Sequence, residues 1–140
     1  MILYAESSAV LAWLLGETRG RDVADAMASA ESIVASELTL VECERVLIRA
    51  WNSGLITEGE RGDQSAHLAR AAGHWTRLRV DDEVVERTRR PFPVEPIRTL
   101  DALHLASALV ARSAVPGVRL LSLDQRVREN GERLGFDLLP

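Results

Sequence analysis

Four acidic residues stand where their side chains could hold a divalent metal ion. Glu6 and Asp124 each follow a short apolar run of strand type, while Glu42 and Asp101 lie near the start of helical patterns. The functional crevice of an open parallel α/β sheet lies outside the carboxyl ends of its strands, so all four can converge there. Carboxylates about 5 Å apart repel by roughly 3 kcal/mol per pair at an effective dielectric near 20, so gathering them requires a counterion. Oxygen-only ligands select Mg²⁺ or Mn²⁺, and such an ion supports phosphodiester hydrolysis.

Each acid also has a simpler structural interpretation. Asp101 falls in a first helical turn, where the helix dipole favours a carboxylate. Glu6 could be an exposed loop acid beside a helix start, and Glu42 an ordinary acid of a first turn. Glu44 is rotated to nearly the opposite side of the same helix and is expected at the surface. The expected convergence of four acids, and not any one of them, favours the metal site.

The elements that must position these acids alternate between strand and helix. Apolar runs predict strands over 1–5, 32–35, 118–123 and 136–139. Helical periodicity predicts helices over 9–15, 17–31, 36–51, 57–78, 79–90, from 99 onward, and over 125–134. The expected helix caps are Ser7 or Ser8, Ser36 or Thr39, Thr57 with Glu60, and Thr99. The sequence therefore predicts one α/β domain over residues 1–140, with a central, mostly parallel sheet of four to five short strands flanked by helices.

Length and composition narrow the class of protein. The chain has 140 residues, with 46% hydrophobic and 27% charged residues, which is typical of one globular domain. A net charge of −4 argues against nucleic-acid binding by bulk electrostatics, although a bound divalent ion could still reach phosphate. Cys43 is the only cysteine, which excludes an internal disulfide. The opening residues lack a basic leader, so we expect a cytoplasmic protein without a membrane span.

Four segments of the chain resemble the successive motifs of PIN domains, in the same order. They are Ile2-Leu-Tyr-Ala-Glu-Ser-Ser-Ala9, Leu38-Thr-Leu-Val-Glu42, Arg98-Thr-Leu-Asp-Ala-Leu-His-Leu-Ala106 and Leu121-Ser-Leu-Asp124. The most similar subfamily is the VapC-type toxin ribonucleases of type II toxin–antitoxin pairs. The resemblance implies a PIN-like fold and a Mg²⁺- or Mn²⁺-dependent RNA endonuclease whose metal-site acids are Glu6, Glu42, Asp101 and Asp124. It also implies a cognate VapB-like antitoxin that caps the site, and a homodimer.

The chain departs from this family at Glu6, where the family usually has aspartate. The extra methylene moves the carboxylate outward by about 1.5 Å, and Mg²⁺ tolerates little deviation from octahedral geometry at roughly 2.1 Å. We expect Glu6 to ligate through water, with weakened Mg²⁺ affinity or a preference for Mn²⁺. The alternative is an attenuated or inactive PIN-like module that binds antitoxin or RNA without cutting it.

Other residues are secondary candidates. Ser7 could hold a phosphate oxygen, as the hydroxyl after the first acid is thought to do in the family, although helix capping is a competing role. Arg98 could contact RNA phosphate, or it could pair with Asp101 or Glu95. His104 is expected to be a packed helix residue. A groove for an antitoxin helix could be formed by Trp13, Leu14, Leu15 and Trp51, for which a core position is the alternative and is favoured for Trp51.

Two other functions do not match the sequence. A receiver-type phosphorylation domain relies on a lysine near its last strand, and this chain has none. A haloacid dehalogenase-like phosphatase needs two aspartates one residue apart on its first strand, whereas Glu6 stands alone after Ala5. His67 and His74 have no partner at metal-ligand spacing and are expected at the surface.

Overall fold

A computed structural model describes all 140 residues and has a five-stranded parallel sheet at its centre. The strands are β1 (Ile2–Ala5), β2 (Ser32–Ser36), β3 (Thr76–Leu78), β4 (Arg119–Leu121) and β5 (Leu138–Leu139). Their order across the sheet is β3-β2-β1-β4-β5, and every neighbouring pair runs parallel. The sheet confirms the predicted α/β class.

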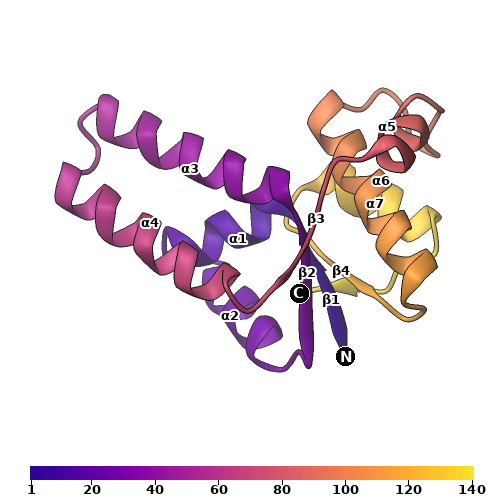
Figure 1. The fold of residues 1–140 in the computed structure, drawn as a ribbon, viewed down its shortest axis with the longest axis horizontal. Coiled ribbons are helices and arrows are strands. Elements are labelled where there is room, and N and C mark those ends of the chain that lie inside the picture. Colours follow the sequence, from indigo (N-terminus) through magenta and orange to yellow (C-terminus); the bar gives the residue numbers. More distant parts are fainter.

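Seven helices cover the two faces of this sheet. They are α1 (Ser7–Leu14), α2 (Gly20–Ala28), α3 (Glu37–Asn52), α4 (Glu58–Ala72), α5 (Asp82–Thr88), α6 (Thr99–Ala114) and α7 (Gln125–Arg133). Helices α1 to α4 lie on one side of the strands, with α3 and α4 as a long hairpin, and α5 to α7 lie on the other side (Figure 1). No helix is both long and apolar enough to cross a lipid bilayer.

The central strand β1 divides the core between these two sides. Successive side chains of a strand point to opposite faces. Leu3 and Ala5 accordingly pack with the buried side chains of α1, α2 and α3, whereas Tyr4 packs with those of α5, α6 and α7. Full burial of a large apolar side chain stabilises a fold by roughly 1.5–3 kcal/mol. Two layers of helices therefore hold β1 and the residues that follow it in place.

Helix α6 packs against the sheet through small residues. Ala106 and Ser107 are fully buried, which allows a close approach of the helix to the strands. Leu100 of the same helix is an exception, since 44% of its surface is exposed. The reason is its place in the first turn, which borders an open cleft instead of the packed sheet.

Some element boundaries differ from the predicted ones. The capping box of Thr57 and Glu60 opens α4 as expected, but the helix ends at Ala72 and does not continue to residue 78. Residues Thr76–Leu78 instead pair with β2 as a strand. Pairing with the open edge of β2 therefore outweighs the local helical pattern. The helices predicted over 17–31 and 79–90 are shorter, at Gly20–Ala28 and Asp82–Thr88.

Candidate active site

The four acids of the predicted metal site all lie at the carboxyl-terminal edge of the sheet. Glu6 directly follows β1, and Asp124 comes just after β4, which is the neighbour of β1. Glu42 lies in the second turn of α3, the helix that follows β2, and Asp101 lies in the first turn of α6. Because all strands run parallel, their carboxyl ends meet at this one edge.

A cleft of about 250 Å³ opens between α3 and the start of α6, and neither Glu6 nor Asp124 lines it. Its acidic lining residues are Glu42 and Asp101, and its other lining residues are Arg98, Thr99 and Leu100. Asp101 is buried, whereas the Arg98 side chain is 67% exposed. The cleft therefore combines carboxylates at its wall with a cationic side chain that solvent reaches.

Glu6 is buried and occupied by hydrogen bonds within the protein. Its Oε1 accepts from the Ser7 hydroxyl at 2.7 Å. Its Oε2 accepts from the Ser122 hydroxyl at 2.8 Å, from the Ser8 amide at 3.1 Å, and from the Ser8 hydroxyl. Glu6 itself is thus the N-cap of α1, and the expectation that Ser7 or Ser8 would cap this helix is wrong. The long glutamate side chain can fold back onto the amide of Ser8, which places the carboxylate among hydroxyl groups.

Hydrogen bonds of Ser8 and Asp124 join the segment after β1 to the segment after β4. The Ser8 hydroxyl accepts from the backbone amides of Leu123 and Asp124, at 2.9 and 3.1 Å. Asp124 caps α7, with its Oδ1 accepting from the amides of Arg126 and Val127 at 2.9 and 3.1 Å. Only the second oxygen of Asp124, Oδ2, is therefore turned to the other site residues.

A buried histidine links Glu42 to the core. His104 is 1% exposed, and its Nε2 contacts Glu42 Oε1 and lies 3.4 Å from the Ser7 hydroxyl. Its Nδ1 lies 3.1 Å from the Tyr4 hydroxyl. Burial raises the pKa of Tyr4 well above its ordinary value, so the phenol keeps its proton and can donate it to Nδ1. The Nε2 proton is then available to Glu42.

The sequence correctly predicts His104 as a packed residue but misses its contact with Glu42. The available signal is its spacing from Asp101, since residues three apart share one side of a helix. A polar side chain on the buried side of α6 needs a partner, and the acids at the same sheet edge were the candidates.

Arg98 bridges two acids from different elements. Its Nε lies 3.1 Å from Asp101 Oδ2, and one terminal nitrogen lies 3.3 Å from Asp124 Oδ2. The hydrogen bond to Asp101 and the negative charges of Asp101, Asp124 and Glu42 raise the pKa of the Arg98 guanidinium. Arg98 also occupies the N-cap position of α6 without a side-chain capping bond, so Thr99 is the first helical residue and not the predicted cap.

The chemistry of these residues fits a divalent metal ion, although the side chains are not arranged around one. All the negatively charged groups of the site are carboxylates, and carboxylate oxygens are the ligands that Mg²⁺ and Mn²⁺ prefer. The guanidinium of Arg98 forms ion pairs with two of these carboxylates, Asp101 and Asp124, and supplies positive charge to the site. As placed, however, no three His, Cys, Asp or Glu side chains form a group that could hold a metal ion. Ligation by the four acids stays a prediction.

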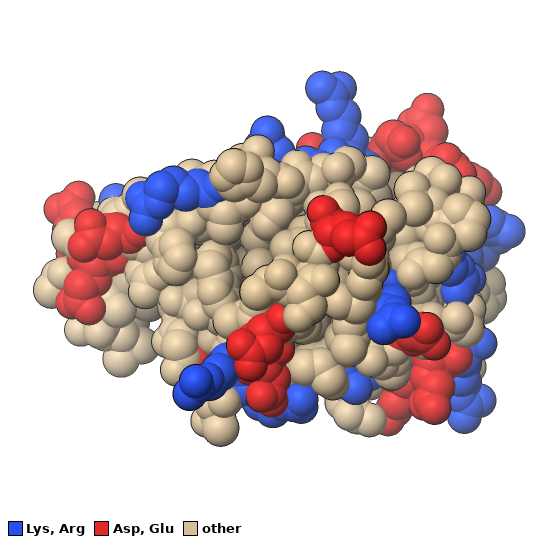
Figure 2. Space-filling view, turned by 90° about the horizontal axis from the view of Figure 1, so that it is seen from below, with Lys and Arg blue, Asp and Glu red and all other residues tan.

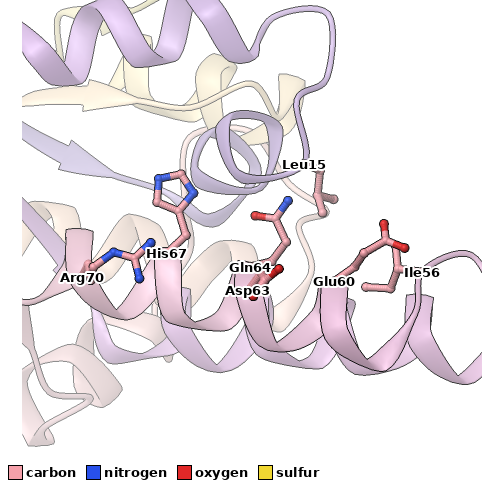
Figure 3. Close-up of a pocket in the computed structure, with 7 residues that line it drawn as sticks. All are labelled: Leu15, Ile56, Glu60, Asp63, Gln64, His67 and Arg70. Carbon is pink, nitrogen blue, oxygen red and sulfur yellow. The ribbon is translucent and has the colours of Figure 1, made fainter.

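A second hollow, of about 550 Å³, lies away from the four acids of the candidate site, between the end of α1 and the side of α4 that faces it (Figure 3). Its lining residues are Leu15, Ile56, Glu60, Asp63, Gln64, His67 and Arg70. Leu15 thus borders a hollow, as expected of a groove residue, while Leu14 is buried. Trp51 was expected in the core but is 42% exposed, and Arg61 lies over its ring. His67 is exposed, as expected, and its ring packs against that of Trp13 at a tilt of 57°, with ring centroids 4.7 Å apart.

The surface charge agrees with the small excess of acidic over basic residues, 21 against 17. On the face shown in Figure 2, acidic and basic side chains stand in small groups separated by uncharged surface, without a continuous basic band. The net charge is −4. Attraction of nucleic acid to this face by bulk electrostatics is therefore weak.

Comparison with known proteins identifies the family. The model of the PIN domain family matches residues 3–132. Among characterised proteins, Ribonuclease VapC46 of Mycobacterium tuberculosis is 30% identical over 137 residues, which cover 98% of this chain and 95% of that protein. Ribonuclease VapC35 of the same species is 33% identical over 137 residues, covering 96% and 93%. The chain belongs to the PIN domain family, and within it to the group of VapC proteins.

Solved structures show the same fold. Mycobacterium tuberculosis VapC20, described as a toxin that cleaves the sarcin–ricin loop, aligns with a TM-score of 0.68 at 18% identity over 99% of both chains. A chain of a toxin–antitoxin complex from Klebsiella pneumoniae aligns with a TM-score of 0.66 at 14% identity over 100% of this chain and 97% of that one. A chain of VapBC2 from Rickettsia felis, bound to a DNA fragment of its promoter, gives 0.64 at 11%, over 99% and 97%.

Proposed function

We propose that this protein is an endoribonuclease toxin of a VapBC-type pair that hydrolyses RNA phosphodiester bonds with a divalent ion. The observation that carries the proposal is the gathering of Glu42, Asp101 and Asp124 at one sheet edge, with a cation drawn in between two of them. The names of the two relatives at 30% and 33% identity, both ribonucleases, support it.

In this proposal the acids have different tasks. Glu42, Asp101 and Asp124 are the direct ligands of Mg²⁺ or Mn²⁺, because each has an oxygen at or near the cleft. Glu6 does not ligate the ion directly but contacts it through water, since both its oxygens already accept hydrogen bonds from serines. A divalent ion held there would polarise the scissile phosphate and lower the pKa of water. His104 fixes the orientation of Glu42.

We assign the direct substrate contact to Arg98 and an indirect role in substrate binding to Ser7. Arg98 is largely exposed at the rim of the cleft, and its planar guanidinium suits a phosphate. Ser7 is buried and donates to Glu6, so it acts on the substrate by orienting that carboxylate.

The test is cleavage of RNA by the purified protein in Mg²⁺ or Mn²⁺, with EDTA as the metal-free condition. We expect cleavage that requires metal and that falls at least about a hundredfold in Asp101→Asn, because a charged ligand of the ion is lost. Asp25→Asn, which neutralises an exposed acid of α2, is the matched control and keeps full activity. Cleavage that persists in EDTA and in Asp101→Asn would refute the proposed function.

The proposed partners are a VapB-like antitoxin and a second copy of the chain. Two of the similar structures are described as a toxin–antitoxin complex and as VapBC2, which supports an antitoxin. The hollow bordered by Leu15 and Ile56, whose other lining residues are polar or charged, is our candidate for its contact with this chain. Co-purification with the product of the adjacent upstream gene, and light scattering of the free protein, test these two assignments.

One observation favours a second candidate, an attenuated enzyme. Glu6 stands where the family usually has aspartate, and its carboxylate is held by three serines instead of facing the cleft. A site with one acid turned inward is expected to bind Mg²⁺ less tightly.

A further inference from the structure

Arg98 occupies the part of the site where a divalent ion would bind. Its guanidinium contacts the Oδ2 atoms of Asp101 and Asp124 at 3.1 and 3.3 Å. The other oxygen of Asp124 accepts hydrogen bonds from two backbone amides in the first turn of α7 and is therefore not available to an ion. Arg98 therefore covers the one Asp124 oxygen that could serve as a ligand.

The same contacts keep a divalent ion away from these two oxygens. A guanidinium is a planar group several ångströms across, and it spans carboxylates on α6 and on the turn after β4. The N–H groups of Arg98 point at the same two Oδ2 atoms that a divalent ion would approach to roughly 2.1 Å, and two positive charges this close together repel each other. Closing Asp101 and Asp124 onto an ion thus requires that Arg98 leave.

Little in the structure opposes this departure. The Arg98 side chain is 67% exposed, and its recorded hydrogen bonds are those to the two aspartates. Arg98 precedes α6 and does not cap it with its side chain, so turning the guanidinium outward leaves the helix start intact. What holds Arg98 in place is the charge of the acids, which a divalent ion would neutralise more strongly.

We propose that Arg98 is the resident counterion of the acid cluster, which a divalent ion displaces and which the phosphate of the substrate then receives at the rim of the cleft. This inference rests on the proposed function, since it concerns the same metal site. It makes Arg98 a competitor of the metal in the free protein. A purely supporting arginine would instead help Asp101 to bind the ion.

Calorimetric titration with Mn²⁺ separates these roles. We expect Arg98→Gln to bind Mn²⁺ about tenfold more tightly than the unmodified protein, because a positive charge next to the ion is removed. Arg21→Gln makes the same change of net charge on an exposed arginine of α2 and is the matched control, with an expected change below about twofold. An unchanged or weaker affinity in Arg98→Gln would overturn the proposal.

A second measurement follows the arginine directly. In the unmodified protein, the NMR signal of the Arg98 Nε–H group, assigned by its absence in Arg98→Gln, is expected to shift toward that of a solvent-exposed arginine as Mg²⁺ is added. A signal that stays in place while Mg²⁺ binds would contradict displacement. If neither protein binds Mn²⁺ or Mg²⁺, the metal site itself fails, whereas equal binding by both refutes only the role of Arg98.

Discussion

The carboxylate of Glu6 can serve either as the N-cap of α1 or as a direct metal ligand, but not as both. It caps α1 and collects three serine hydroxyls, so its charge stabilises the junction of β1, α1 and β4. Hydrogen bonds to a charged group contribute about 1.5–3 kcal/mol, and a helix cap about 1 kcal/mol. An acid that points into this junction gives stability at the expense of direct ligation.

Glu6→Asp tests this balance. The shorter side chain withdraws the carboxylate from Ser122 and leaves that hydroxyl without its partner, so we expect a loss of roughly 1–3 kcal/mol in the free energy of unfolding without metal. We also expect tighter Mg²⁺ binding and faster RNA cleavage. Urea denaturation in EDTA and cleavage assays measure the two effects.

The control for this substitution is Glu83→Asp, which removes one methylene from an exposed acid in the first turn of α5. It should change neither stability nor cleavage beyond experimental error. A Glu6→Asp protein that is as stable as the original and cleaves RNA no faster would show that glutamate is not limiting at this position.

The positions of the acids could be predicted from the sequence, but their contacts could not. An acid directly after an apolar strand, as at Glu6 and Asp124, indicates the carboxyl edge of a parallel sheet. The bridge from Arg98 to Asp124 joins residues 26 positions apart. It depends on which strand lies beside β1 and on side-chain rotamers, and neither is encoded in local spacing.

At the scale of elements, the strand–helix alternation was sufficient to predict the sheet but not all of its members. Strand β3 has only three residues, too few for a period of two to be recognised, and it follows Gly73 within what reads as a continuing helix. Its pairing with Val34, Ala35 and Ser36 is a tertiary interaction. Short edge strands of this kind follow from the rest of the sheet and not from their own sequence.

The contact of α1 with α2 gives a prediction at this scale. A Cβ atom on Gly20 would lie 2.3 Å from the carbonyl oxygen of Ala12, which is backbone and cannot move aside. We expect Gly20→Ala to destabilise the fold by about 1–3 kcal/mol, through overpacking where the two helices meet. Chemical denaturation of the purified variant measures the loss.

Gly62→Ala is the matched substitution. Gly62 lies inside α4 with open space around it, so alanine should raise the free energy of unfolding by roughly 0.5–1 kcal/mol through helix propensity. Opposite signs for the two variants are the expected result. A Gly20→Ala protein as stable as Gly62→Ala would show that α1 and α2 are not in close contact.

At the scale of the whole molecule, the proposed site needs both sides of the sheet. Glu42 comes from α3, on the side of α1 to α4, and Asp101 comes from α6, on the opposite side (Figure 1). Asp124 follows β4, which lies between them in the fold. Only the complete sheet, with its two layers of helices, brings these acids together.

The negative charge of the protein bears on the role that we propose for a metal ion. The molecule carries a net charge of −4, and its acid cluster adds local negative charge where, in the proposed function, an RNA phosphate approaches. Without a cation this approach is repulsive. Arg98 supplies one positive charge, and we expect a divalent ion to supply the rest.

Anomalous diffraction from crystals of the protein containing Mn²⁺ is the most direct test of the central claim. Our account predicts one strong peak between Glu42, Asp101 and Asp124, with the Arg98 guanidinium displaced from Asp124. Two results would contradict it. One is a Mn²⁺ peak at some other place in the protein and none at these acids, and the other is a structure in which Arg98 still contacts Asp101 and Asp124 and none of the three carboxylates ligates Mn²⁺.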